Sequence, residues 1–240
     1  MSDAALPAAG TRPKRSGRPT AFKRLVANRL SASGLIVLGV IVALALLAPI
    51  LPIPEPNVTE PANRLMRPGA PGHLLGTDHL GRDILSRLIW GARVSLAVGV
   101  AATVAAAVIG SLIGLVAGFA GGRADNLLMR GIDLVMAFPY VRLARGIVAV
   151  LGPGLLNALY AIAIVNIPFF ARNVRGVTLG FARREFVDAA RLSGASPATL
   201  LFTEVAPNVL PTIVITMSTT IGWMILETAG LSFLGLGAQP

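Results

Sequence analysis

The sequence contains no cysteine, which excludes disulfide bonds and thiolate metal sites. Charged residues make up only 13% of the 240 residues, and aromatic residues only 5%. A nucleic-acid interface would combine basic side chains with aromatic ones, so the net charge of +10 has another origin. The hydrophobic content of 54% and the mean hydropathy of +0.73 are typical of a membrane protein.

Three motifs of common enzyme classes are absent as well. The sequence has no Gly-x-x-x-x-Gly-Lys-Ser/Thr loop for nucleotide phosphates, no His-Glu-x-x-His and no Gly-x-Ser-x-Gly. We therefore expect no catalytic residue, no cofactor and no metal site in this chain. If the protein moves a solute uphill, the energy must come from a partner protein or an ion gradient.

Five apolar segments are long enough to cross a bilayer, at about 1.5 Å per helical residue and a core of roughly 30 Å. The predicted spans are residues 34–53, a segment within 94–122, 132–151, 155–171 and 205–226. Residues 1–33 form a basic tail, residues 54–93 a long loop with a short interfacial helix, and residues 94–240 a core with spans 2–5. The expected fold class is an all-α polytopic membrane protein.

The basic residues predict the orientation of these spans. Most of them lie in the tail, in the short loop after span 2 and in the polar segment after span 4. Lys and Arg accumulate on the cytoplasmic side of membrane proteins, so we expect the N-terminus in the cytoplasm. The loop 54–93 is then extracytoplasmic.

The polar segment between spans 4 and 5, here called the elbow (residues 183–206), reads as a helix, a break and a second helix. Gly194 has the position of a C′ glycine, and Ser196 followed by Pro197 is typical of a helix start. We expect the second helix to end near Ala206, with Pro207 beginning the next segment. Small or apolar residues at helical spacing predict one face of the first helix: Phe186, Ala189, Ala190 and Ser193.

The elbow resembles the "EAA" loop of ABC-importer permeases, which reads Glu-Ala-Ala, three residues, Gly, nine residues and Ile-x-Leu-Pro. Asp188 stands at the position of the Glu, Glu204 at the Ile and Ala206 at the Leu. The resemblance implies that the elbow contacts an ATPase subunit. The residues expected to couple to that ATPase are Glu185, Asp188, Ala189, Ala190, Arg191, Gly194 and Pro207.

A second pattern precedes span 2. Its residues are Gly76, Thr77, Asp78, Gly81, Arg82, Asp83, Ser86 and Arg87. The spacing resembles dipeptide, oligopeptide and nickel permeases of the "C" type. Asp78, His79 and Asp83 could alternatively suggest a metal cluster, but Arg82 and Arg87 neutralise the acids, so we expect no metal here.

The resemblance implies a type I ABC-importer permease bundle. It also implies a second homologous permease, two ATP-binding subunits, an extracytoplasmic substrate-binding protein and a bacterial inner membrane, with no nucleic acid. In the family, the segment matching residues 227–237 is followed by a sixth span. We therefore expect the chain to be truncated or naturally short.

Two features of the spans call for interpretation. Arg142 and Arg145 share one face of span 3, and either line the substrate path or face lipid headgroups or a neighbouring subunit. Gly110, Gly114 and Gly118 form a stripe in span 2, which we assign to helix packing. The expected function is import of di- or oligopeptides. The alternatives are nickel or another small solute, an ATP-independent secondary transporter, or a membrane scaffold.

Overall fold

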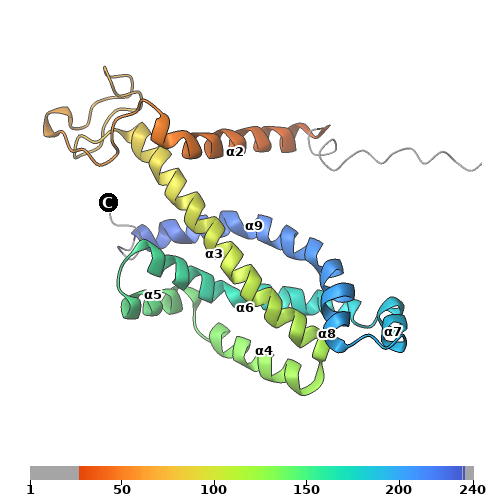
Figure 1. Cartoon of the computed structure of the whole chain (residues 1–240). Helices are drawn as coiled ribbons and strands as arrows, with labels where there is room; N and C mark the ends of the chain where they lie inside the picture. The colour runs from red at the N-terminus through yellow and green to blue at the C-terminus, as the bar shows by residue number, and fades with distance from the viewer. Residues whose placement is uncertain (1–26, 234, 236–240) are drawn as a thin grey trace, which may run out of the picture.

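The structure, a computed structural model, describes residues 27–233 and 235. It is built from helices joined by turns and loops (Figure 1), which confirms the all-α fold class. Most of the predicted basic tail lies outside the described residues. The helices are α2 (Arg29–Leu47), α3 (Ile84–Ala120), α4 (Gly122–Met136), α5 (Tyr140–Leu151), α6 (Leu155–Phe181), α7 (Glu185–Leu192), α8 (Pro197–Thr199) and α9 (Ala206–Phe233). Short 3-10 helices occur at η1 (Ala48–Ile50) and η2 (Pro61–Asn63), and a π-helical turn at η3 (Leu200–Val205).

Among the described residues, four helical stretches are long and apolar enough to cross a membrane: residues 29–50, α3, α6 and residues 197–233. The count rises to five if α4 and α5, which meet at 85°, form one broken span. The predicted span 3, residues 132–151, is thus interrupted by a full break. Pro139 is the N-cap of α5 and lacks the N–H that would continue α4.

Several helix boundaries differ from the sequence prediction. Helix α3 begins at Ile84 and runs for 37 residues, so the expected interfacial helix is its first part. No proline separates the two, and helix-compatible residues continue between them. Helix α9 likewise follows η3 without interruption. Pro207 lies in the first turn of α9 and does not end the helical stretch. The π-helical turn before it is closed by a hydrogen bond from the Ala206 N–H to the Leu201 carbonyl.

The glycine stripe of α3 packs against α6, which confirms its assignment to helix packing. A Cβ atom on Gly110 would lie 2.6 Å from the Ile167 carbonyl oxygen, and one on Gly114 would lie 2.5 Å from the Ala171 carbonyl oxygen. Only glycine permits this approach of the two backbones.

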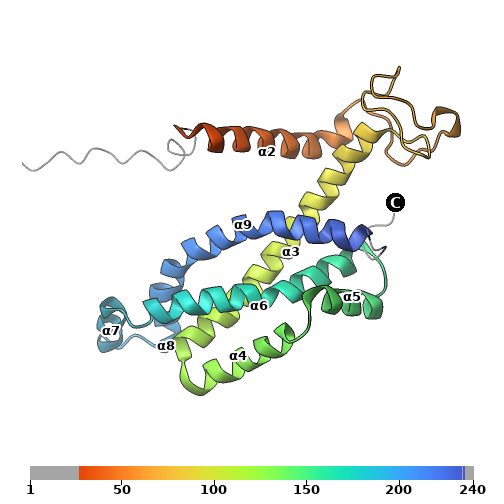
Figure 2. The ribbon, with the colours of Figure 1, turned by 180° about the vertical axis from the view of Figure 1, so that it is seen from behind.

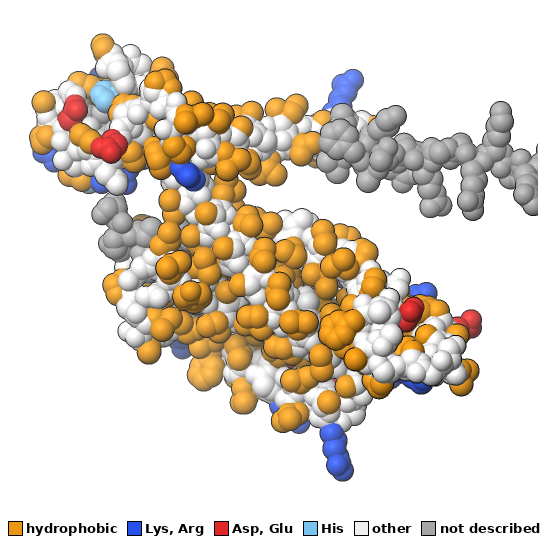
Figure 3. Space-filling model, viewed as in Figure 1, with side chains coloured by type: hydrophobic (Ala, Val, Ile, Leu, Met, Phe, Trp, Pro, Cys, Tyr) orange, Lys and Arg blue, Asp and Glu red, His pale blue; other side chains and the backbone are white. Residues whose placement is uncertain are grey.

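Helix α2 extends away from the rest of the bundle and meets it only near the start of α3 (Figure 1). In this arm, only Ala45 and Ala48 are buried. In the space-filling view, apolar side chains cover most of the visible face, and the acidic side chains gather at the α2–α3 loop and at the elbow (Figure 3). This distribution fits a surface that faces hydrocarbon or other membrane helices.

Candidate functional site

The elbow protrudes from the end of the bundle opposite the loop that joins α2 and α3 (Figure 2). A hydrophobic cluster attaches it to the spans. Its buried members are Leu115, Val174, Val187, Leu200, Leu201, Val205, Val209 and Ile213. They come from α3, α6, α7, η3 and α9, so the elbow and the membrane helices share one core.

Helix α7 ends in a Schellman motif, as the sequence predicted for Gly194. Gly194 has φ +87°, and its N–H donates to the Arg191 carbonyl at 3.0 Å. The Ala195 N–H donates to the Ala190 carbonyl at 3.2 Å. These two bonds satisfy carbonyl groups that the helix end would otherwise leave without partners.

The second half of the elbow also begins as predicted. The Ser196 hydroxyl accepts the Thr199 N–H at 3.2 Å, and Pro197 occupies the first helical position. From Pro197 the backbone is helical through to Phe233. The second half of the elbow and α9 therefore form one continuous helical stretch.

The buried side of α7 is not the face of small or apolar residues that the sequence predicted. Val187 is fully buried and Ala190 half-buried, whereas Phe186, Ala189 and Ser193 are exposed. Contacts with α6 and η3 decide which side of α7 faces inward, and the helical spacing within α7 carries no information about those elements. The predicted apolar face is thus largely a free surface.

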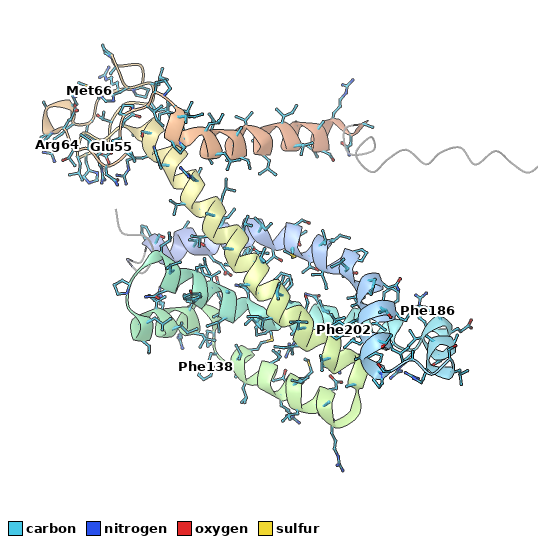
Figure 4. The ribbon with its side chains drawn as sticks, viewed as in Figure 1. Glu55, Arg64, Met66, Phe138, Phe186 and Phe202 are labelled. Atoms are coloured by element: carbon cyan, nitrogen blue, oxygen red, sulfur yellow. The ribbon has the colours of Figure 1, made fainter. Side chains whose placement is uncertain are left out.

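The exposed side of the elbow carries both apolar and charged groups. Phe186 is 37% exposed, Leu192 89% and Phe202 55%, and Figure 4 places Phe186 on α7 and Phe202 on the adjoining segment. Glu185 is also exposed, as is Pro207. Large exposed apolar side chains beside charged ones are typical of a protein-binding surface.

Asp188 and Arg191 pair with each other in this structure. Arg191 Nη1 donates to Asp188 Oδ1 at 3.0 Å, and more than half of each side chain is exposed. An exposed pair of this kind contributes little stability, on the order of 0–1 kcal/mol. Both groups can therefore exchange their bond for one with a partner at small cost.

The second predicted group, before span 2, folds the loop between α2 and α3. Gly76 and Gly81 have φ of +77° and +79°, and a Cβ on either would overlap the backbone carbonyl of Met66 or Glu60. Thr77 accepts the Met66 N–H at 2.9 Å and donates to the Asn63 carbonyl. These contacts tie distant parts of the loop together near the labelled Met66 (Figure 4).

Asp78 is the acceptor at the centre of this loop. Its Oδ1 accepts the N–H groups of Leu80 and Arg82, and its Oδ2 accepts the Arg82 Nε at 2.8 Å. Arg87 Nε lies 4.0 Å from the same carboxylate. Burial of Asp78 opposes its ionisation, but these hydrogen bonds prevail and lower the pKa of Asp78 to about 2.

Asp83 connects the loop to α3. Its Oδ2 caps the helix by accepting the Ser86 N–H at 2.8 Å, and its Oδ1 lies 3.0 Å from His73 Nδ1. The Ser86 hydroxyl donates to the Pro54 carbonyl at 2.5 Å. The histidine that meets the acid is therefore His73, whereas the side chain of His79 is exposed. The geometry assigns the motif a structural role in this loop.

The two arginines of the broken span lie on α5, and both are exposed. Neither Arg142 nor Arg145 lines the cavity where α5, α6 and α9 meet. This placement favours the interpretation that they face lipid headgroups or a neighbouring subunit.

Several polar contacts between helices escaped the sequence analysis, two of which join α6 to α4 and to α9. Arg175 on α6 binds Asp125 on α4 through two bonds, of 2.5 and 2.6 Å. Asn166 on α6 donates to Glu227 on α9 at 3.0 Å. The partners are far apart in sequence. A single polar residue in or near a span does not reveal which residue of another helix it will contact.

Comparison with known proteins places this geometry in a family. Residues 110–240 match the binding-protein-dependent transport system inner membrane component, and residues 20–68 match the N-terminal TM domain of oligopeptide transport permease C. The dipeptide transport system permease protein DppC of Alkalihalophilus pseudofirmus is 44% identical over 219 residues, covering 91% of this chain and 72% of the relative.

Two further relatives agree. The di/tripeptide transport system permease protein DppC of Pseudomonas aeruginosa is 41% identical over 220 residues, covering 89% of this chain and 72% of the relative. The glutathione transport system permease protein GsiD of Pectobacterium atrosepticum is 40% identical over 210 residues, covering 87% of this chain and 69% of the relative. The chain belongs to the family of binding-protein-dependent transport system inner membrane components, and is a multi-pass permease subunit of the ABC-transporter class.

Proposed function

We propose that this chain is the permease subunit of an ATP-driven importer of small peptides, and that its elbow passes the motion of an ATPase partner into α9. The observation that carries this proposal is the path of the chain through the elbow. The elbow is exposed on its outer side, held to the spans by Val187, and continuous with α9 from Pro197 onward.

The mechanism follows from that continuity. ATP binding draws two ATPase subunits together. Each ATPase subunit moves the permease elbow that is docked on its surface. Because the elbow shares a core with α3, α6 and α9, it moves with them as one body and does not bend separately. Rotation of these helices against those of a second permease opens the path alternately to each side of the membrane.

The relatives support the cargo class. Their names refer to transport of dipeptides, di- and tripeptides, and glutathione. We assign small peptides to this chain on that basis, delivered by an extracytoplasmic binding protein. The basic residues of the tail and the elbow support a cytoplasmic N-terminus, with the elbow on the cytoplasmic side of a bacterial inner membrane, where it would meet the ATPase.

Gly194 provides the first test. The variant Gly194→Trp puts a bulky side chain on a backbone with φ +87°, a conformation that costs other residues about 1–2 kcal/mol. We expect it to abolish substrate-stimulated ATP hydrolysis by the assembled importer, while the chain still inserts in the membrane. ATP hydrolysis is measured in proteoliposomes with and without the loaded binding protein, and uptake of Ala-Ala, glutathione and Ni²⁺ is followed in parallel.

The matched control is Gly194→Asn, because asparagine tolerates the left-handed conformation. It should retain stimulated hydrolysis within about twofold, a change of less than 0.5 kcal/mol. Normal stimulation in the Trp variant would contradict the coupling role. Uptake of Ni²⁺ without uptake of either peptide would contradict the assigned cargo.

A further inference from the structure

A small cavity is lined by residues of α5, α6 and α9. Figure 2 shows these three helices side by side. Its volume is about 170 Å³. Its wall is mostly apolar, with Val141, Ala144 and Ile162 on one side. The polar exception is Glu227, which is half-buried, six residues before the last residue of α9.

Both oxygens of Glu227 have neutral donors. Asn166 Nδ2 donates to Oε2 at 3.0 Å, and Trp223 Nε1 donates to Oε1 at 2.5 Å. The Asn166 amide is itself held by the Ile162 carbonyl at 2.9 Å. The carboxylate is thus fixed in one orientation by groups that do not neutralise its charge.

No basic side chain forms an ion pair with Glu227 within the described residues. Arg142 and Arg145 lie on α5 but do not line the cavity. A carboxylate beside an apolar wall is costly unless a cation reaches it, and acidic residues within spans often mark ligand paths. The site therefore has room for a positive charge that the described residues do not supply.

Two aromatic rings complete the wall. Tyr140 and Trp223 line the cavity, and each is about half exposed, at 47% and 53%. Aromatic faces attract ammonium groups by cation–π interaction, worth about 0.5–2 kcal/mol. A carboxylate with two aromatic rings is suited to a primary ammonium. One water occupies about 30 Å³, so the cavity has room for only a few groups of that size. It can hold the aminoalkyl end of a ligand but not a whole peptide.

We propose that the Glu227 cavity binds the primary ammonium group of the cargo, as on the amino terminus of a peptide, during its passage. This inference rests on the proposed import of peptides for its role, but the ammonium site itself can be tested separately. It adds a specificity-determining contact within the membrane to the selection made by the binding protein.

The test uses the importer assembled from co-expressed subunits in lipid nanodiscs. Benzoylphenylalanine replaces Leu226, which lies on the cavity rim and is 64% exposed. Illumination then records which radiolabelled probe lies nearby, butylamine or the uncharged butanol. We expect butylamine to label the protein about tenfold more than butanol, and Glu227→Gln to remove that preference.

Two further variants complete the design. Glu227→Asp keeps the charge and should preserve a preference for butylamine, whereas Glu55→Gln removes an exposed loop carboxylate and should leave labelling unchanged. Equal labelling in the parent and in Glu227→Gln would overturn the ammonium site. Loss of the second permease from the Glu227→Gln complex would also overturn it, by showing that Glu227 binds a neighbouring subunit.

Uptake of Ala-Ala by the same complexes in proteoliposomes separates this inference from the proposed function. Absence of ATP-driven uptake by the parent would contradict peptide import, whatever the butylamine result. Uptake by the parent with a KM raised about tenfold in Glu227→Gln, and kcat little changed, would support both proposals.

Discussion

Asp78 shows how one carboxylate stabilises a long loop. It accepts two backbone N–H groups and the Arg82 guanidinium, so a single side chain closes the turn from Asp78 to Arg82. The sequence identified the residue through its spacing, and local pairing with Arg82 was foreseeable. The contact of Thr77 with Asn63 was not, because it depends on how the loop folds back on itself.

Asp78 also predicts a pH dependence. Its pKa in the folded loop, about 2, lies below the ordinary 3.8, so its contribution to stability is fully present above about pH 4 and is lost as the pH falls toward 2. Cleavage of the loop by pepsin should accelerate over that range. In Asp78→Asn, cleavage should be fast already at pH 4 and change less with pH.

The control for this measurement is Glu55→Gln, which removes an exposed carboxylate from the same loop. It should keep the pH response of the parent. If Asp78→Asn resisted pepsin at pH 4 as well as the parent does, the carboxylate would not hold the loop together.

The close approach of α3 and α6 is the main contact between elements in the bundle. The stripe of glycines was visible in the sequence, since small residues every fourth position leave one helix face bare. Which helix fills that face was not, because any span of suitable length could do so. The structure places Ile167, Phe170 and Ala171 of α6 there.

Gly114→Val tests this contact. Its new Cβ would lie 2.5 Å from the Ala171 carbonyl oxygen, so α3 and α6 must move apart. Forcing extra atoms into a packed contact costs typically about 1–3 kcal/mol. We expect the detergent-purified chain to melt several degrees lower, as measured by the loss of helical circular dichroism.

Gly176→Val on α6 is the matched control, because a Cβ there meets nothing within 4 Å. It carries the same helix-propensity change without the steric conflict. Equal melting temperatures for the two variants would contradict the assignment of the stripe to packing.

The helices of the elbow illustrate what a sequence can and cannot predict about an element. Gly194, Ser196 and Pro197 act on their own neighbours through backbone conformation and capping, so their roles were predictable. The inward side of α7 depends on Val187 joining the cluster formed with α6 and η3, and helical spacing alone did not identify it. Likewise, the start of α3 was placed too late because no residue marks where a helix leaves the bilayer.

The whole molecule has two ends with different roles in this account. One end is the folded loop between α2 and α3, with Glu227 nearby in the spans. The other is the elbow, whose core is continuous with α3, α6 and α9. Between them the surface is apolar, and α2 stands away from the bundle with nearly all of its side chains exposed (Figure 3). Such an arm suits a subunit that assembles with other membrane helices.

The most direct measurement is cross-linking of the elbow to its ATPase. The chain has no cysteine, so Phe186→Cys and Leu74→Cys each create one defined thiol, on the elbow and on the opposite loop. In the complex purified with its co-expressed subunits, a cross-linker with a maleimide for the thiol and a succinimidyl ester for a lysine amine of the partner should join Phe186→Cys to an ATP-binding subunit, with a yield that changes when ATP is added. Leu74→Cys should not join to it. An intact complex in which Phe186→Cys gives no such product, or Leu74→Cys does, would contradict the proposal that the elbow couples this permease to ATP.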